Sequence, residues 1–309
     1  MKPRRLPALV AILLLSIPSA PGSSLTPATL TLITVDGVPA FEAAVTGFLT
    51  EEPNSRVIRL KADLGNARSS LEEEAARSPA RVVALGSQAS LAVNRWLGGC
   101  PAIFGFILTP SRLPKPADDS VCFSLTLDPE VRIEALSRLF GAPARFTVLA
   151  GPDGAVEAAA LAAAGARRHM VIHVIPIRQA SEIATALRSI DKNTQALILT
   201  TESLFLKEDL VEAILLTTLS RGVPVIGFSE MLVRRGGLAS LDINYSDYAA
   251  ELAREARSMS GDTPRRLGNP IRYPRSYRWV VNTHTARTLG ITIPGEVLSA
   301  ATMAGGGAR

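Results

Sequence analysis

The feature that most constrains the fold is a regular alternation, after residue 30, of short apolar runs with longer stretches of helical periodicity. The apolar runs are rich in Val, Ile and Leu and lack the polar alternation of a sheet with one wet face. Such runs are typical of parallel strands that are buried on both faces. The alternation therefore predicts βαβ units and an α/β fold with parallel sheets.

The alternation falls into two comparable series, which predict two Rossmann-like lobes. Strands of the first series are expected at 30–35, 57–60, 81–85, 102–107 and 121–125, with helices at 41–51, 67–78 and 87–97. A helix at 129–139 opens the second series, followed by strands at 146–150, 170–175, 196–200 and 224–228 and helices at 155–164, 180–190 and 207–221. The segment 237–294 is too short for a third domain, and should complete the two lobes with a strand, a helix at 246–260 and a last strand at 278–281.

The amino-terminal 22 residues are typical of a secretory signal. Lys2, Arg4 and Arg5 precede an apolar run from Leu6 to Ile17, and small residues follow. This run is too short to span a bilayer comfortably, so cleavage is favoured over an uncleaved anchor. Residues 1–22 are therefore predicted to be a cleaved signal peptide, which places the mature chain in the periplasm.

The charge of the chain indicates no polyanionic partner. The formal net charge is +5 and falls to about +2 without Lys2, Arg4 and Arg5. The other basic residues are scattered or in short pairs, without the interleaved aromatic residues of a nucleic-acid surface. Nucleic acid is therefore not expected as a partner.

Cys100 and Cys122 are the two cysteines of the chain. In an oxidising compartment they could form a disulfide, because they flank the start of two neighbouring strands. Two buried, unpaired thiols are the equally weighted alternative.

Polar residues follow several predicted strands, where open parallel sheets bind their ligands. In the first series these residues are Gly86, Ser87, Gln88, Ser90 and Thr109. In the second series they are Asp153, Thr201, Glu202, Ser229 and Glu230. Backbone N–H groups at the start of a helix could hold a carboxylate or phosphate. Each loop by itself serves equally well as a helix cap, so the candidate ligand site depends on their recurrence.

Motifs for catalysis, metal binding and cofactor binding are missing from the sequence. The chain has three histidines, and no nucleophile elbow, H-E-x-x-H, phosphate-binding loop or dinucleotide fingerprint. The sequence therefore predicts neither catalytic residues nor a metal site or cofactor.

Two carboxy-terminal stretches resemble the ABC transporter substrate-binding family that includes tryptophan and tyrosine binders. They are Gly222 to Tyr245, with Gly-Val-Pro-Val-Ile-Gly-Phe-Ser, and Tyr273 to Pro294, with Tyr-Pro-Arg-Ser-Tyr-Arg-Trp-Val-Val-Asn. The resemblance covers roughly 80–294. Two departures, Thr109-Pro110 in place of an Asp-Pro pair and Gly151-Pro152 in place of an Asn, bear on the ligand.

The resemblance implies a type I periplasmic-binding fold whose lobes are joined by three crossings near Leu125, Ile243 and Pro274. Lobe 1 would comprise 28–125 plus 244–274 and lobe 2 would comprise 126–243 plus 275–300. The tail at 301–309 is predicted to be disordered from its glycine-rich composition. Closure over a ligand would follow by hinge motion.

The resemblance also implies a function, with two alternatives. In the first, a monomeric receptor delivers a small ligand, such as an amino acid or related acid, to an ABC permease and its ATPase. Gly86, Ser87 and Ser90 would then hold a carboxylate, and Glu202 or Glu230 an ammonium group. In the second, a sensory or scaffold protein of the same fold serves a periplasmic partner without any transporter.

Overall fold

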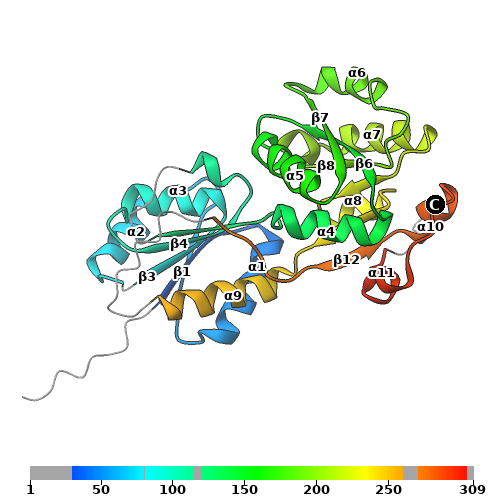
Figure 1. Cartoon of the computed structure of the whole chain (residues 1–309). Coiled ribbons are helices and arrows are strands. Elements are labelled where there is room, and N and C mark those ends of the chain that lie inside the picture. The colour runs from blue at the N-terminus through cyan, green and yellow to red at the C-terminus, as the bar shows by residue number, and fades with distance from the viewer. Residues whose placement is uncertain (1–29, 80, 114–119, 260–270, 305–309) are drawn as a thin grey trace, which may run out of the picture.

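The computed structural model describes residues 30–79, 81–113, 120–259 and 271–304 (Figure 1). The predicted signal peptide lies outside these residues. Within them, no helix combines the length and the apolar character that crossing a membrane requires.

The first lobe is built on a six-stranded parallel sheet in the order β11-β5-β4-β3-β1-β2. Its central strands are buried on both faces, which is why they are mostly apolar in the sequence. The strands are β1 (Leu30–Val35), β2 (Arg56–Leu60), β3 (Arg81–Leu85), β4 (Ala102–Ile107), β5 (Val121–Ser124) and β11 (Ile271–Arg272).

Helices cover both faces of this sheet. On one face α1 (Pro39–Glu51) lies beside α9 (Tyr245–Ser258), although the two are far apart in the sequence. On the other face α2 (Ala67–Ala76) and α3 (Gly86–Trp96) pack on the same strands through a separate apolar cluster. The first lobe is thus a three-layered α/β unit that includes a carboxy-terminal helix.

The second lobe has a seven-stranded sheet in the order β13-β12-β10-β9-β8-β6-β7. All its pairs are parallel except β10 with β12. The strands are β6 (Ala144–Ala150), β7 (Met170–Pro176), β8 (Ala196–Leu199), β9 (Val225–Gly227), β10 (Ala239–Asp242), β12 (Arg278–Val281) and β13 (Ala301–Met303).

The helices of the second lobe also divide between two faces. The pair α4 (Pro129–Phe140) and α5 (Ala155–Arg167) belongs to the main apolar core. The pair α6 (Ile183–Arg188) and α7 (Glu208–Ser220) belongs to another apolar cluster on the opposite face. Shorter helices of this lobe are α8 (Glu230–Arg234), α10 (Thr283–Thr288), α11 (Gly295–Ser299) and the 3-10 turns η2 (Ala180–Glu182) and η3 (Ser203–Leu206), while the 3-10 turn η1 (Pro110–Arg112) belongs to the first lobe.

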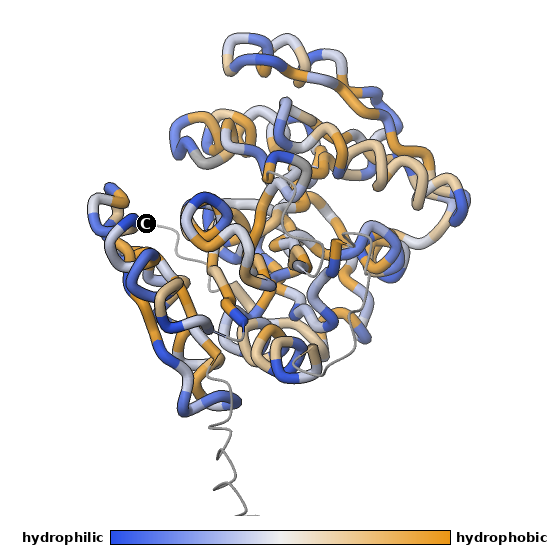
Figure 2. The backbone as a smooth tube through the Cα atoms, turned by 90° about the vertical axis from the view of Figure 1, so that its left-hand side faces the viewer, coloured by the Kyte–Doolittle hydropathy of each residue, from blue (hydrophilic) through white to orange (hydrophobic). Residues whose placement is uncertain are grey.

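The chain passes between the two lobes three times. It leaves β5 for α4, leaves β10 for α9, and leaves β11 for β12. Figure 1 shows these connections in the narrow region between the lobes, and the main apolar core continues through it. In Figure 2 hydrophobic stretches lie along the interior elements and hydrophilic residues gather at the outer turns.

The predicted α/β class with parallel sheets is confirmed, and most elements begin within two residues of their expected positions. The helix predicted at 180–190 is shorter than expected because its first turn is the 3-10 turn η2, whereas α7 agrees with the helix predicted at 207–221 and the 3-10 turn η3 precedes it. The predicted disordered tail is wrong for 301–303, which form β13 by pairing with β12. Residues 305–309 lie outside the described part of the chain.

The disulfide hypothesis fails on strand register. Cys122 lies opposite Phe104 in the β4–β5 pair, whereas Cys100 precedes Phe104 by four residues. At about 3.3 Å per residue this offset is roughly 13 Å along the strands, and a disulfide tolerates a Cα separation of only about 4.4–6.8 Å. Both thiols are free, and that of Cys100 donates to the carbonyl of Pro79 at 3.5 Å.

Candidate functional site

All three crossings leave a strand at its carboxyl end: β5 and β11 in the first lobe, and β10 in the second. These three crossings, which we call the hinge, therefore lie at the carboxyl edges of both sheets, where open α/β sheets bind ligands. Two cavities lie there.

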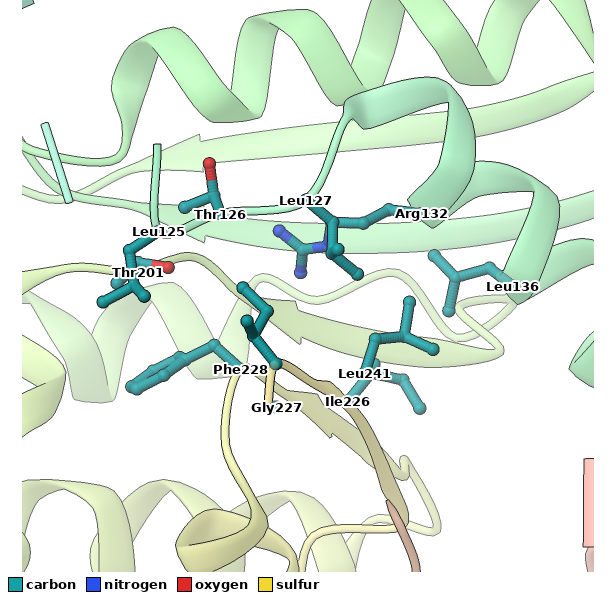
Figure 3. A pocket seen from close by; sticks show the side chains of 11 residues that line it. Leu125, Thr126, Leu127, Arg132, Leu136, Thr201, Ile226, Gly227, Phe228 and Leu241 are labelled. Atoms are coloured by element: carbon teal, nitrogen blue, oxygen red, sulfur yellow. The ribbon is translucent and has the colours of Figure 1, made fainter. Parts of the chain in front are cut away.

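The first, which we call the hinge cavity, is formed by the first crossing, helix α4 and the carboxyl ends of second-lobe strands (Figure 3). It has a volume of about 30 Å³. It is lined by Leu125, Thr126, Leu127, Arg132, Leu136, Thr201, Ile226, Gly227, Phe228, Leu241 and Ile243. A small number of polar side chains among mostly apolar ones is typical of a ligand pocket.

The second, which we call the cleft cavity, is formed by both lobes and has a volume of about 70 Å³. It is lined by Leu108, Thr109, Pro110, Ser124, Thr126, Leu127, Pro129, Asp153, Val156, Glu157, Ala160, Ile271 and Tyr273. Thr126 and Leu127 line both cavities, so the two are adjacent parts of one inter-lobe site.

An ion pair between α4 and α5 separates the two cavities. Arg132 lines the hinge cavity and Glu157 lines the cleft cavity, and their charged groups are in direct contact. The side chains are only 7% and 12% exposed. The other oxygen of Glu157 accepts a hydrogen bond from the backbone N–H of Thr201 at 3.2 Å. Because both carboxylate oxygens are engaged, Glu157 holds the guanidinium in place.

Glu202 is buried against the turn that begins α5. Its Oε2 accepts hydrogen bonds from the backbone N–H groups of Asp153 and Gly154, both at 2.9 Å. A Cβ on Gly151 would lie 2.4 Å from the same oxygen, so only glycine leaves room for the carboxylate. Glu202 therefore satisfies N–H groups at the start of α5. Its side chain does not cap the helical turn that follows it, and its predicted role toward a ligand stays a prediction.

Asp153 and Glu202 share this turn and differ in pKa. Hydrogen bonding from Ser203, whose hydroxyl lies 2.5 Å from Asp153 Oδ2, lowers the pKa of Asp153. Burial raises the pKa of Glu202, and the neighbouring Asp153 carboxylate adds to this rise. The two carboxyl groups thus form an unequal pair in which Asp153 is the more acidic.

Among the described residues, an ion pair links the two sides of the cleft. Arg112, in the 3-10 turn after β4, pairs with Asp153 at the start of α5. Arg112 belongs to the first lobe and is 60% exposed on its side chain, whereas that of Asp153 is 11% exposed. This contact links the lobes at the edge of the cleft cavity, and its exposed partner makes it sensitive to salt.

The four residues predicted at the start of α3 line neither of these cavities. Ser87 and Gln88 are exposed, and the hydroxyl of buried Ser90 donates to the carbonyl of Gly86 at 2.8 Å. Gly86 has φ +83°, and a Cβ there would lie 2.6 Å from the ring of Phe41. The glycine is thus required by backbone conformation and close packing.

Of the remaining predicted residues, some line a cavity and others lie outside both cavities. Thr109 and Asp153 line the cleft cavity, and Thr201 lines the hinge cavity. Ser229 precedes α8, and Glu230 pairs with Arg234 and Arg278. These contacts occupy both oxygens of Glu230.

Three residues of the site, Arg132, Glu157 and Arg112, were not predicted from the sequence. A signal for Arg132 exists, because it lies four residues before Leu136 on the buried face of α4, where a charge is unusual. For Glu157 and Arg112 the sequence carries no comparable signal, because charged residues are common at such helix and turn positions. Within the described ranges, no three His, Cys, Asp or Glu side chains gather closely enough to hold a metal ion.

Comparison with known proteins agrees with this architecture. A family model described as "ABC transporter substrate binding protein" matches residues 131–304. No curated protein matches the chain.

Solved structures match over nearly the whole chain. A conserved domain protein from Vibrio cholerae is 17% identical with a TM-score of 0.61, covering 89% of this chain and 99% of its own. A Streptococcus pneumoniae ABC domain in complex with L-Trp is 17% identical with a TM-score of 0.60 and the same coverages. The ligand-free, open structure of CD0873, a substrate binding protein from Clostridium difficile, is 16% identical with a TM-score of 0.70, covering 89% and 98%. At these identities the likeness shows the fold, which is the type I periplasmic-binding fold.

Proposed function

Because the chain belongs to the ABC transporter substrate-binding protein family, we propose that it is an exported receptor that binds a small solute between its lobes and delivers it to an ABC importer. The observation that carries this proposal is the position of the two adjoining cavities, at the hinge and at the carboxyl edges of the sheets. A site of this kind supports binding without chemistry, and we propose no catalytic role.

Ligand binding would favour closure of the cleft. The cleft cavity is lined from the first lobe by Leu108 and Thr109 and from the second by Val156 and Glu157. A solute that contacts both walls gains contacts in the closed state that an open state lacks, and so shifts the population toward closure. The three crossings are the segments in which such a hinge motion would be absorbed.

A thermal-shift screen of small solutes tests the receptor function. The panel should include amino acids, monocarboxylates, amines and sugars. A ligand present at 100 times its dissociation constant stabilises the fold by about 2.7 kcal/mol. Small-angle scattering with the best ligand should then show a smaller radius of gyration. If no solute in a broad panel stabilises the protein, the receptor function is rejected.

Export and the transport partner are further parts of the proposal. Lys2, Arg4 and Arg5 before an apolar run favour cleavage of residues 1–22 and release into the periplasm. Intact-mass analysis of protein from the periplasmic fraction tests this, and retention of Met1 would contradict it. Ligand-dependent stimulation of a cognate permease and ATPase in vesicles tests delivery. A ligand-binding protein that stimulates no transporter would favour the sensory alternative.

A further inference from the structure

Arg132 is a buried charge on the apolar face of α4. It shares this face with Ile133, Leu136 and Leu139, and its side chain is only 7% exposed. Burying a guanidinium is unfavourable unless its charge is paired and its N–H groups find acceptors. The partner that the structure gives it is Glu157.

That pairing leaves most of the guanidinium available. An arginine has five N–H donors in a planar fork. The hydrogen bond found for Arg132 among the described residues joins one Nη1 donor to Glu157 Oε1. Figure 3 shows the guanidinium reaching into the hinge cavity, with the hydroxyl of Thr201 pointing into the same space. The free side of this fork suits a carboxylate, which arginine binds through two parallel hydrogen bonds.

The walls around Arg132 are mostly apolar, so they suit a hydrocarbon group. Besides Arg132, the polar side chains of the hinge cavity are those of Thr126 and Thr201. The apolar side chains are Leu125, Leu127, Leu136, Ile226, Phe228, Leu241 and Ile243. A volume of about 30 Å³ admits a small group of atoms before any opening of the lobes.

The carboxylates near the cavities, by contrast, are already occupied. Asp153 pairs with Arg112 and accepts from Ser203, and both oxygens of Glu157 are engaged. Glu202 is turned onto backbone N–H groups. The ammonium group of an amino acid would therefore have to displace an existing partner within the described part of the site.

We propose that the hinge cavity selects a small apolar monocarboxylate without an ammonium group, and that Arg132, oriented by Glu157, binds its carboxylate. This proposal rests on the receptor function and narrows its ligand class. It moves the expected carboxylate site from the start of α3 to α4, on the opposite lobe.

Calorimetric titration with two matched sets of probes tests this proposal. The first set is 4-methylpentanoate, L-leucine and isopentylamine, and the second is 3-phenylpropanoate, L-phenylalanine and 2-phenylethylamine. Within each set the hydrocarbon is closely related, while the carboxylate and the amine are present together or singly. We expect saturable binding of at least one of the two monocarboxylates, weaker binding of its amino acid and none of its amine.

The variants separate binding from folding. Arg132→Gln should weaken monocarboxylate binding by about thirtyfold or more, because it removes the charged partner of the ligand's carboxylate in a buried site. Since this leaves Glu157 buried without its partner, the double variant Arg132→Gln/Glu157→Gln removes both charges together and should show the same loss. Arg138→Gln is the matched control, because Arg138 lies on the same helix and pairs with exposed Glu134. It should leave affinity unchanged.

Three results would overturn the proposal: binding by the double variant within threefold of the unaltered protein, an amino acid or amine that binds as well as its matched monocarboxylate, or no binding of either monocarboxylate. Each of these leaves the receptor function intact if another solute in the broad panel stabilises the fold. The receptor function fails only if no solute does so.

Discussion

Replacing Glu202 with alanine is expected to destabilise the second lobe without weakening ligand binding. The carboxylate accepts two backbone N–H groups at 2.9 Å, those of Asp153 and Gly154, and its residue is 2% exposed. Hydrogen bonds to a charged group contribute roughly 1.5–3 kcal/mol each. The alanine variant loses both and leaves two N–H groups without their acceptor.

The burial of Glu202 partly offsets this loss. Burial raises the pKa of Glu202, which means that the folded state bears a penalty for the charge that alanine would remove. We therefore expect a net decrease of about 2–4 kcal/mol in the free energy of unfolding for Glu202→Ala. Glu202→Gln keeps an oxygen acceptor and the approximate shape, so its decrease should be about 1 kcal/mol.

Urea unfolding followed by circular dichroism gives the free energy of unfolding, and the slopes should agree among the variants. Glu182→Ala is the matched control, because Glu182 accepts one backbone N–H, that of Arg178, at an exposed site of the same lobe. It should cost about 0.5 kcal/mol, the lower end for a single hydrogen bond.

The same variants must also be titrated with the identified ligand. Affinity within threefold of the unaltered protein is expected, because Glu202 lines neither cavity. If Glu202→Ala keeps its stability and loses tenfold or more in affinity, Glu202 does not act by stabilising the start of α5. That result would return Glu202 to the ligand site.

Three further predictions follow from the packing. Burial raises the pKa of Cys122 to about 12 and also raises that of Cys100. Both thiols should therefore resist iodoacetamide at pH 8 in the native protein and react after unfolding without reductant. If neither cysteine reacts after unfolding without reductant, a disulfide is present and the prediction is wrong. Gly86→Ala should lower stability by more than about 1 kcal/mol, because it combines a positive φ with a clash against Phe41; an unchanged melting curve would show that the turn adapts. Arg112→Gln removes the ion pair across the cleft, so small-angle scattering of the ligand-free variant should give a larger radius of gyration. An equal radius would show that this ion pair does not hold the two lobes together.

The secondary-structure elements and the α/β class could be predicted from local sequence patterns. Strands such as Arg81–Leu85 and Ala102–Ile107 were recognisable because a parallel strand buried on both faces is mostly apolar. Helices were recognisable from their period and, for α4, from Asp128, whose side chain accepts from the N–H of Glu130 as an N-cap. These signals are local, so they need no knowledge of the rest of the chain. They also placed Thr201 and Asp153 at strand ends near the cleft.

The orientation of the polar side chains and the contacts between distant residues depend on tertiary packing. Glu202 binds N–H groups about fifty residues earlier in the chain, and Arg132 meets Glu157 across two helices. Cys100 and Cys122 are separated by strand register, which depends on the pairing of β4 with β5. Periodicity specifies which face of an element is buried, but contacts between distant residues are set by how the elements pack. For this reason the sequence could predict polar residues at strand ends, of which Thr109, Asp153 and Thr201 line the cavities, but not the charged pairs formed between distant elements.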